Sequence, residues 1–178
     1  MAASATLPYF AKPSVALSAV DKQAAYNRAI SEIKAVLGDE TDPMVKMVTI
    51  NCLLKTHLPY YFWVGFYLVK NGQLVVGPYQ GTLGCLTIEF GRGVCGKAAQ
   101  TGQTQIVDDV HALEQGTQHI ACDPNSRSEI VVPVFNAEKE LIAVFDVDST
   151  LPDSFDEVDK ANLERLFSLM CLSICVLG

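Results

Sequence analysis

Hydrophobic residues recur at helical spacing in the first third of the chain. Over residues 18–37 apolar positions repeat every three or four residues, which predicts an amphipathic helix ended by Gly38. A second helix is predicted over 42–57. Asp42 can cap its free N–H groups, and Pro43 suits the first helical position, where a missing N–H costs nothing.

The middle of the chain changes to the aromatic and β-branched composition of strands. Asn71-Gly72 is a strong signal for a tight hairpin turn, and it separates a predicted strand over 60–69 from one over 74–79. Further strands are predicted over 105–107, 129–135 and 141–148, with a short helix over 96–100 before them.

A last helix is predicted after these strands. Ser154 and Glu157 fit a capping box, in which a hydroxyl and an acid three residues later satisfy the first free N–H groups. The order of elements predicts an α+β fold, with a central antiparallel sheet and flanking helices largely on one side. The length of 178 residues fits one domain over 18–178, preceded by an extended arm over 1–17.

Composition and charge restrict the partners and the compartment. The chain is 49% hydrophobic and 19% charged, as in globular proteins, and its net charge of −7 without a basic run disfavours nucleic acids and anionic membranes. The first ten residues resemble no signal peptide, and the apolar stretch 167–177 is about half the ~20 residues of a bilayer span. We therefore expect a cytoplasmic protein whose cysteines are kept reduced.

The six cysteines fall into two groups by their surroundings. Three stand in the predicted helices, where a buried thiol packs as a small hydrophobe: Cys52, Cys171 and Cys175. Three stand in glycine-rich or irregular segments, where backbone can approach a ligand: Cys85, Cys95 and Cys122. Free N–H groups around Cys122, in the long polar segment 108–128, could lower the thiol pKa and raise its reactive thiolate fraction.

Two acids end an otherwise apolar strand. Asp146 and Asp148 stand two residues apart and so point to one face of the sheet. Burying two carboxylates is costly unless a cation or hydrogen-bond donors meet them, and Glu129, at the start of the preceding strand, can join them across the hairpin. Such a cluster fits an ammonium pocket or a proton-donating acid. The alternative is a strand that emerges into solvent at Asp146.

Aromatic residues alternate along the first predicted strand. Trp63, the only tryptophan, shares one face with Tyr61, Gly65 and Tyr67. The other face carries Phe62, Val64 and Phe66. One face is expected to enter the core, and the other either packs there too or lines a pocket. Thiols, carboxylates and aromatic rings together indicate a small zwitterionic sulfur or amino-acid ligand.

Six segments of the chain form an ordered set of motifs: Tyr61-Phe-Trp-Val-Gly-Phe-Tyr67, Gly77-Pro-Tyr-Gln-Gly81, Gly91-Arg-Gly-Val-Cys-Gly96, Ile120-Ala-Cys-Asp123, Ser126-Arg-Ser-Glu-Ile-Val-Val-Pro133 and Val144-Phe-Asp-Val-Asp-Ser149. In order and with compatible spacing, these segments resemble the free methionine-(R)-sulfoxide reductases. The resemblance runs from about residue 20 to the C-terminus, with no departure at the three loop cysteines or the three acids.

The resemblance implies a single GAF-type domain that reduces free, not protein-bound, methionine-(R)-sulfoxide. Cys122 would attack the sulfoxide sulfur, leaving methionine and a cysteine sulfenic acid. Cys85 would convert the sulfenic acid into a disulfide, which thioredoxin reduces with electrons ultimately from NADPH, without a bound cofactor or metal. Cys95 would assist, and the division of roles between Cys95 and Cys122 stays open.

The same resemblance implies the substrate contacts. Glu129, Asp146 and Asp148 would hold the substrate ammonium and supply the proton, while Trp63 would pack on the methyl group with Tyr67 beside it. A homodimer is compatible with the apolar final helix and with the family.

Two other classes of protein compete with this interpretation. A non-catalytic GAF module that senses a small ligand is the nearest, but it leaves three loop thiols unexplained and the chain has no room for an output domain. A zinc protein using the loop cysteines and a histidine is disfavoured. The cysteines are separated by nine and twenty-six residues, unlike the close pairs of zinc sites.

Overall fold

A six-stranded antiparallel sheet forms the centre of the computed structural model, which describes residues 11–113 and 123–170. The strands follow the order β3-β2-β1-β6-β5-β4 across the sheet. They are β1 (Trp63–Lys70), β2 (Gln73–Gln80), β3 (Thr87–Glu89), β4 (Gln105–Val107), β5 (Ser128–Phe135) and β6 (Leu141–Ser149). The described helices are α1 (Ala19–Leu37), α2 (Pro43–His57), α3 (Gly93–Thr101), α4 (Val110–Leu113) and α5 (Glu157–Met170).

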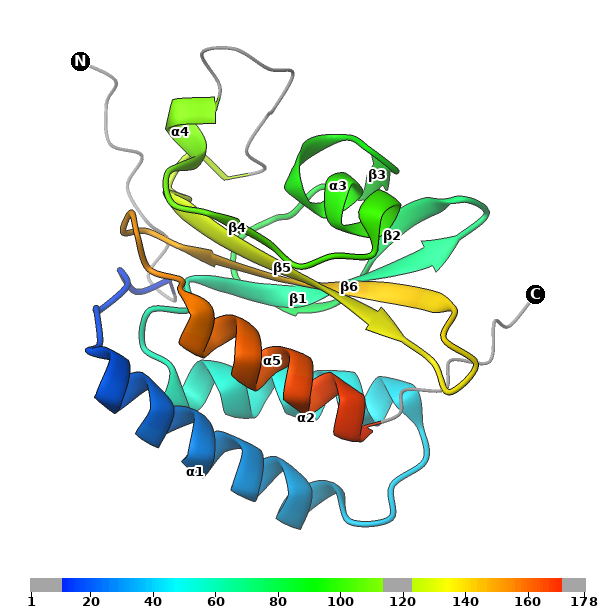
Figure 1. Ribbon diagram of the computed structural model, residues 1–178, viewed down its shortest axis with the longest axis horizontal. Helices are drawn as coiled ribbons and strands as arrows, with labels where there is room; N and C mark the ends of the chain where they lie inside the picture. Colours follow the sequence, from blue (N-terminus) through cyan, green and yellow to red (C-terminus); the bar gives the residue numbers. More distant parts are fainter. Residues whose placement is uncertain (1–10, 114–122, 171–178) are drawn as a thin grey trace.

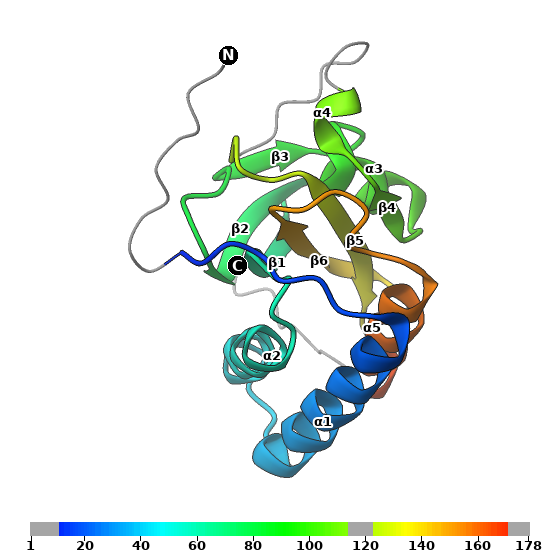
Figure 2. The same ribbon diagram turned by 90° about the vertical axis from the view of Figure 1, so that its left-hand side faces the viewer.

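The long helices cover one face of the sheet and α3 covers the other (Figure 1). Helices α2 and α5 contact the sheet, and α1 packs against both of them, as the end-on view shows (Figure 2). On the opposite face α3 packs against β5 and β6. The α+β fold, its antiparallel sheet and the placement of helices largely on one side are therefore confirmed.

The first two helices start within one residue of their predicted beginnings, and the second uses the predicted cap. The Ser18 hydroxyl accepts a hydrogen bond from the Asp21 N–H at 3.2 Å, and α1 ends before Gly38. The Asp42 carboxylate accepts from the Met44 N–H at 2.7 Å. Both helix predictions are confirmed, because short polar side chains satisfy the free N–H groups of a first turn.

The capping box predicted at Ser154 is wrong by two residues. Asp156 is the N-cap of α5: its carboxylate accepts from the Val158 N–H at 2.8 Å, and its own N–H donates to Asp159 at 2.9 Å. The Ser154 hydroxyl is buried and donates instead to the Ser149 hydroxyl at 2.7 Å. The hydrogen bond to Ser149 therefore replaces the predicted bond to the first turn of the helix.

Helix α3 starts at Gly93, three residues before the predicted start, so Cys95 lies in a helix and not in a loop. Gly91 and Gly93 have φ values of 82° and 61°, which let the chain turn tightly into the helix. A Cβ added to Gly96 would lie 2.3 Å from the Glu89 carbonyl oxygen, so glycine allows α3 to pack this closely on β3.

Side chains of β1 alternate between two hydrophobic cores. Phe66 packs with the three long helices, whereas Trp63 and Tyr67 pack on the α3 side. Tyr61 and Phe62 precede the strand, and their predicted faces are wrong: Tyr61 enters the three-helix core and Phe62 the α3 core. The alternation of side chains holds only within the strand itself.

A buried ion pair joins α1 to α5. Lys22 Nζ lies 2.6 Å from Asp159 Oδ2, and the other Asp159 oxygen accepts hydrogen bonds from the hydroxyls of Tyr26 and Tyr60. Asp159 is fully buried and Lys22 is 4% exposed. A charge at this depth is tolerated because it is paired and hydrogen-bonded.

The three cysteines of the predicted helices were expected to pack as buried thiols. Cys52 is exposed on α2, so its assignment to packing is wrong, while Cys171 and Cys175 lie outside the described residues. Within residues 11–113 and 123–170, no helix combines the length and apolar character that a bilayer span requires.

Candidate functional site

Three carboxylates gather on the α3 face of the sheet. Glu129 on β5 and Trp63 on β1 both pair with Asp148 on β6, so these three residues form one row across three strands. Asp146 lies two residues earlier on β6 and points to the same face. Glu129 and Asp146 are only 7% and 6% exposed, and Asp148 is half-buried. The strand therefore does not emerge into solvent at Asp146.

Helix α3 adds a thiol to these acids. The Cys95 thiol is free, 4% exposed, and donates to Glu129 Oε1 with an Sγ to oxygen distance of 3.8 Å. One atom each of Cys95, Glu129 and Asp146 lies within 4.8 Å of the other two. We call Cys95, Glu129, Asp146 and Asp148 the acid–thiol cluster.

Burial disfavours every charged form in the acid–thiol cluster. Desolvation raises the pKa of Asp146 to about 7, and the neighbouring Cys95 and Glu129 side chains limit the rise. The pKa values of Glu129 and Asp148 are raised well above their ordinary values, by burial first and then by the charge of Asp146. Burial, Asp146 and Glu129 likewise raise the pKa of Cys95. The cluster therefore retains protons, and Cys95 is a neutral thiol.

One carboxylate oxygen of the cluster has no partner. Asp146 Oδ1 is buried and makes no hydrogen bond in the part of the chain that the structure describes. None of the ion pairs between described residues involves a member of the cluster. A buried acceptor of this kind favours a ligand that brings a proton donor or a cation.

An aromatic wall borders the cluster. The Trp63 ring stacks between Tyr67 and Tyr79, at ring-centre distances of 5.8 Å and 5.2 Å, and its Nε1 donates to the Thr82 carbonyl at 3.0 Å. Burial and the charge of Asp146 raise the pKa of Tyr67, so its hydroxyl stays protonated. The stacking role of Tyr79 is not predicted by the alternation within β1, because Tyr79 comes from the neighbouring strand.

Three glycines make room for the tryptophan ring. A Cβ added to Gly65 would lie 2.7 Å from Trp63 Cη2 and 2.4 Å from Tyr79 Cβ. At Gly81 the Cβ would lie 2.5 Å from Trp63 Cδ1, and at Gly84 it would lie 3.1 Å from Trp63 Cζ2. The glycine-rich composition of these segments indicates close packing, but it does not predict that Trp63 is the packing partner.

Asp123 connects two of the cysteine-bearing segments. Its Oδ2 accepts a hydrogen bond from the Thr82 hydroxyl, and its Oδ1 accepts from the backbone and side-chain amides of Asn125 at 2.7 Å and 2.8 Å. Thr82 stands three residues before Cys85, which is half-buried, and Asp123 directly follows Cys122. Cys122 itself lies outside the described residues, so its predicted role is not examined by the structure.

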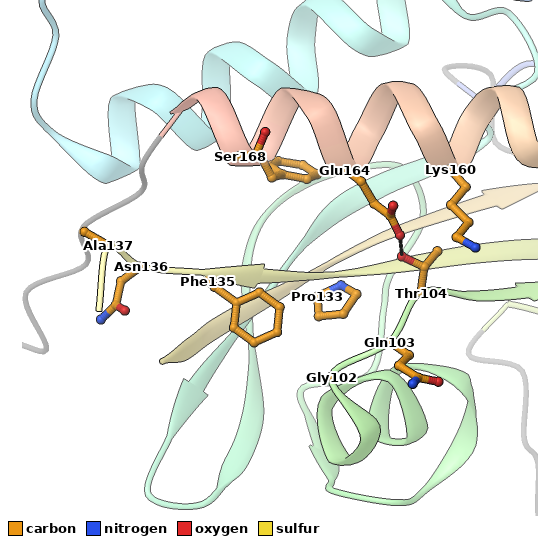
Figure 3. Close-up of a pocket in the computed structure, with 11 residues that line it drawn as sticks. Gly102, Gln103, Thr104, Pro133, Phe135, Asn136, Ala137, Lys160, Glu164 and Ser168 are labelled. Carbon is orange, nitrogen blue, oxygen red and sulfur yellow. Dashed lines mark hydrogen bonds between the residues drawn. The ribbon is translucent and has the colours of Figure 1, made fainter. Parts of the chain in front are cut away.

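A separate pocket of about 770 Å³ lies between α5 and the end of β5 (Figure 3). It is lined by Gly102, Gln103, Thr104, Pro133, Phe135, Asn136, Ala137, Lys160, Glu164, Phe167 and Ser168. Its acid, Glu164, accepts a hydrogen bond from the Thr104 hydroxyl at 2.6 Å. The lining carries no thiol and none of the predicted site residues, so we place the functional site at the acid–thiol cluster.

The fold and the cluster together define a small α+β domain of the GAF type. The family model described as GAF domain matches residues 60–173. The free methionine-R-sulfoxide reductase of Escherichia coli is 38% identical over 135 residues, covering 76% of this chain and 79% of that protein.

Solved structures support the same family assignment. The X-ray structure of free methionine-R-sulfoxide reductase from Neisseria meningitidis in complex with its substrate aligns with a TM-score of 0.78 and 41% identity, over 90% of this chain and 93% of that one. A putative GAF sensor protein from Burkholderia vietnamiensis aligns with a TM-score of 0.77 and 41% identity, over 84% and 93%. The chain belongs to the GAF domain family and, within it, to the family of the free methionine-R-sulfoxide reductases. The resemblance of the sequence motifs is thereby confirmed.

Proposed function

We propose that this protein reduces free methionine-(R)-sulfoxide to methionine beside the acid–thiol cluster. The observation that carries the proposal is the convergence of three carboxylates, a thiol and a stacked aromatic wall on one buried face of the sheet. A free amino acid with an oxidised thioether offers a matching group for each of them.

The carboxylates suit the substrate ammonium. An ammonium group brings three donors and a positive charge to a site where Asp146 Oδ1 lacks a partner and several acids retain protons. In peptide-bound methionine sulfoxide the ammonium is replaced by an amide, which would leave the carboxylates unpaired. Selectivity for the free amino acid follows from this cost.

The aromatic wall suits the apolar end of the substrate. Trp63 pairs with Asp148 across β1 and β6, so an amino acid held by the acids can place its S-methyl group on the indole. The position of the ring is held by Tyr67 and Tyr79, the three glycines and the bond to Thr82. A protonated acid of the cluster can supply a proton to the departing sulfoxide oxygen.

The redox steps follow the cysteine chemistry implied by the family. The Cys122 thiolate attacks the sulfoxide sulfur, the S–O bond breaks, and oxygen transfer leaves methionine and a Cys122 sulfenic acid. Cys85 attacks that sulfur, releasing water and forming a disulfide, which a thioredoxin-like dithiol reduces by exchange. The raised pKa of the buried Cys95 supports giving the first attack to Cys122. Cys95 then serves as a proton-donating neighbour of Glu129 or as a second resolving thiol.

These steps need a reducing compartment, which agrees with the expected cytoplasmic location. A homodimer stays part of the proposal, and size-exclusion chromatography with light scattering measures it directly.

The test is NADPH consumption with thioredoxin and thioredoxin reductase. Free methionine-(R)-sulfoxide, its (S) epimer and a peptide-bound sulfoxide are offered in parallel, and we expect turnover with the free (R) form alone. Glu129→Ala should raise KM strongly and Cys122→Ser should abolish turnover, whereas Cys52→Ser, on the exposed face of α2, should match the wild type. Normal multiple turnover by Cys122→Ser would refute the cysteine assignment.

A ligand sensor is the second candidate, because the putative GAF sensor protein from Burkholderia vietnamiensis is as similar as the reductase structure. No turnover with any of the three sulfoxides, from a folded and fully reduced sample, would favour this alternative. Binding of a small ligand without consumption of NADPH would then identify the sensor.

A further inference from the structure

Three potential metal ligands converge in the acid–thiol cluster. Cys95 Sγ and one carboxylate oxygen each of Glu129 and Asp146 lie within 4.8 Å of one another. The three side chains come from α3, β5 and β6, which pack against each other around a common hydrophobic core. Their positions are therefore set by the fold and not by a flexible loop.

The spacing is close to that of a tetrahedral zinc site. With Zn–S of about 2.3 Å and Zn–O of about 2.0 Å, a sulfur and an oxygen on one zinc ion are about 3.5 Å apart. The observed distance from Cys95 Sγ to Glu129 Oε1 is 3.8 Å. All three ligand atoms lie within 4.8 Å of one another, so side-chain rotations would have to shorten the longer separations before one ion could bind all three.

The electrostatics of the cluster also favour a cation. Asp146 is 6% exposed, and its Oδ1 makes no hydrogen bond to any residue that the structure describes. This acceptor without a partner lies among three carboxylic acids and a thiol, none of which has an ion-pair partner among the described residues. A divalent ion would satisfy the acceptor, and it would displace the protons that its ligands retain in the metal-free cluster.

The ligand set selects the type of metal. A thiol with two carboxylates suits a borderline-soft ion, whereas Mg²⁺ and Ca²⁺ prefer oxygen ligands alone. We propose that the substrate-free, reduced protein binds one thiophilic divalent cation, with Zn²⁺ as the first candidate, through Cys95, Glu129 and Asp146. This ligand set differs from a zinc site built on the three loop cysteines and a histidine, because two of its three ligands are acids.

The metal would compete with the substrate. Glu129 and Asp146 are the carboxylates assigned to the substrate ammonium, so the ion and the amino acid cannot occupy the site together. This consequence, unlike the binding itself, rests on the proposed reductase function. Cys95 would lose its proton to solvent and bind the ion as a thiolate, so oxidation of its sulfur would release the metal.

Binding is tested on the reduced full-length protein in a buffer free of thiols and chelators. We expect isothermal titration with Zn²⁺ to include one tight equivalent that Cys95→Ser and Asp146→Asn each weaken at least tenfold. Cys52→Ser is the matched control, since it removes an exposed thiol and should leave that equivalent unchanged. Titration with Cd²⁺ should give a thiolate charge-transfer band that Cys95→Ser removes and Cys52→Ser keeps. Zinc affinity that is unchanged in both Cys95→Ser and Asp146→Asn would overturn the proposal.

X-ray absorption at the zinc edge tests the ligand set without any substitution. The one-equivalent wild-type complex should show one sulfur and otherwise oxygen neighbours. A shell of several sulfurs, or one without sulfur, would contradict the proposed site even if a variant failed to fold.

Competition between Zn²⁺ and the substrate is measured in a single turnover. No thiol reductant is then needed, and none is present to bind the metal. Pre-reduced protein is mixed with free methionine-(R)-sulfoxide, and methionine formed per protein is followed by chromatography. We expect Zn²⁺ to raise the substrate concentration needed for half-maximal rate without changing the maximal rate, and a chelator to restore activity. Metal binding without any methionine formation would refute the reductase function alone. Methionine formation without metal binding at the cluster would refute this inference alone.

Discussion

Thr82 is the residue through which the aromatic wall and the segment after Cys122 are joined. Its carbonyl accepts a hydrogen bond from Trp63 Nε1 at 3.0 Å, while its hydroxyl donates to Asp123 Oδ2. Thr82→Val keeps the shape of the side chain and the carbonyl, but it removes the hydroxyl donor. The variant therefore breaks the link to Asp123 and spares the link to Trp63.

The expected loss follows from the contacts of Asp123. A hydrogen bond to a charged acceptor contributes about 1.5–3 kcal/mol. Asp123 is 9% exposed and keeps both bonds from Asn125, so water and these donors offset part of the loss. We expect a cost of about 1–2 kcal/mol in holding the segment in place. If Cys122 must be held there to react, the rate falls by about fivefold to thirtyfold.

The assay is a single turnover that follows methionine formation and disulfide formation separately. Both rates should fall in Thr82→Val, while KM should change little because the Trp63 bond persists. Thr56→Val is the matched control: Thr56 is exposed on α2, and its hydroxyl donates only within that helix, to the Cys52 carbonyl at 2.8 Å. Wild-type rates in Thr82→Val, or an equal loss in Thr56→Val, would show that the Thr82–Asp123 hydrogen bond does not position the reacting segment.

Three further predictions concern packing, the ion pair and pH. Gly65→Ala would place a methyl group 2.7 Å from Trp63 Cη2, so urea unfolding should show a loss of about 1–3 kcal/mol in stability. Because the indole is displaced, KM should rise as well. An unchanged KM would show that the Trp63 ring does not contact the substrate. Lys22→Met leaves the fully buried Asp159 without a cation and should cost about 3–5 kcal/mol in urea unfolding, with activity per folded molecule preserved. Burial raises the pKa of Asp146 to about 7, so the folded protein keeps a proton that the unfolded chain releases above pH of about 4. The free energy of unfolding of the protein should therefore fall by up to about 1.4 kcal/mol per pH unit between pH of about 4 and about 7. If Asp146→Asn and the wild type show parallel profiles of unfolding free energy against pH, this prediction is wrong.

The meeting of the three acids could be predicted because it depends on local rules. Strand alternation puts Asp146 and Asp148 on one face, and a hairpin between neighbouring strands pairs Glu129 with Asp148. The same rules placed Trp63 and Tyr67 together. What the pattern could not decide was burial, since two acids at the end of an apolar strand are equally compatible with solvent.

The contacts that complete the site depend on residues far apart in the chain. Thr82 and Asp123 are 41 positions apart, and neither stands in a periodic pattern that predicts the bond. The position of Cys95 was missed for a related reason: glycine-rich sequence reads as a loop, whereas here Gly96 lets the first turn of α3 pack on β3. A single sequence can indicate close packing through its glycines, but it does not identify the partners of a close contact or of a long-range hydrogen bond.

The surroundings of Cys95 bear on which of the three loop cysteines reacts. Cys95 is 4% exposed, next to Glu129 and Asp146, and the burial that prepares these carboxylates for an ammonium also raises the pKa of the thiol. Without a bound cation, burial and the neighbouring acids disfavour a Cys95 thiolate at this place. The nucleophile of the proposed reaction is therefore better supplied from outside the acid–thiol cluster, by Cys122, while Cys95 stays protonated. On this argument Cys95→Ala should keep the first oxygen transfer and Cys122→Ser should lose it, a difference that a single turnover measures without any reductant.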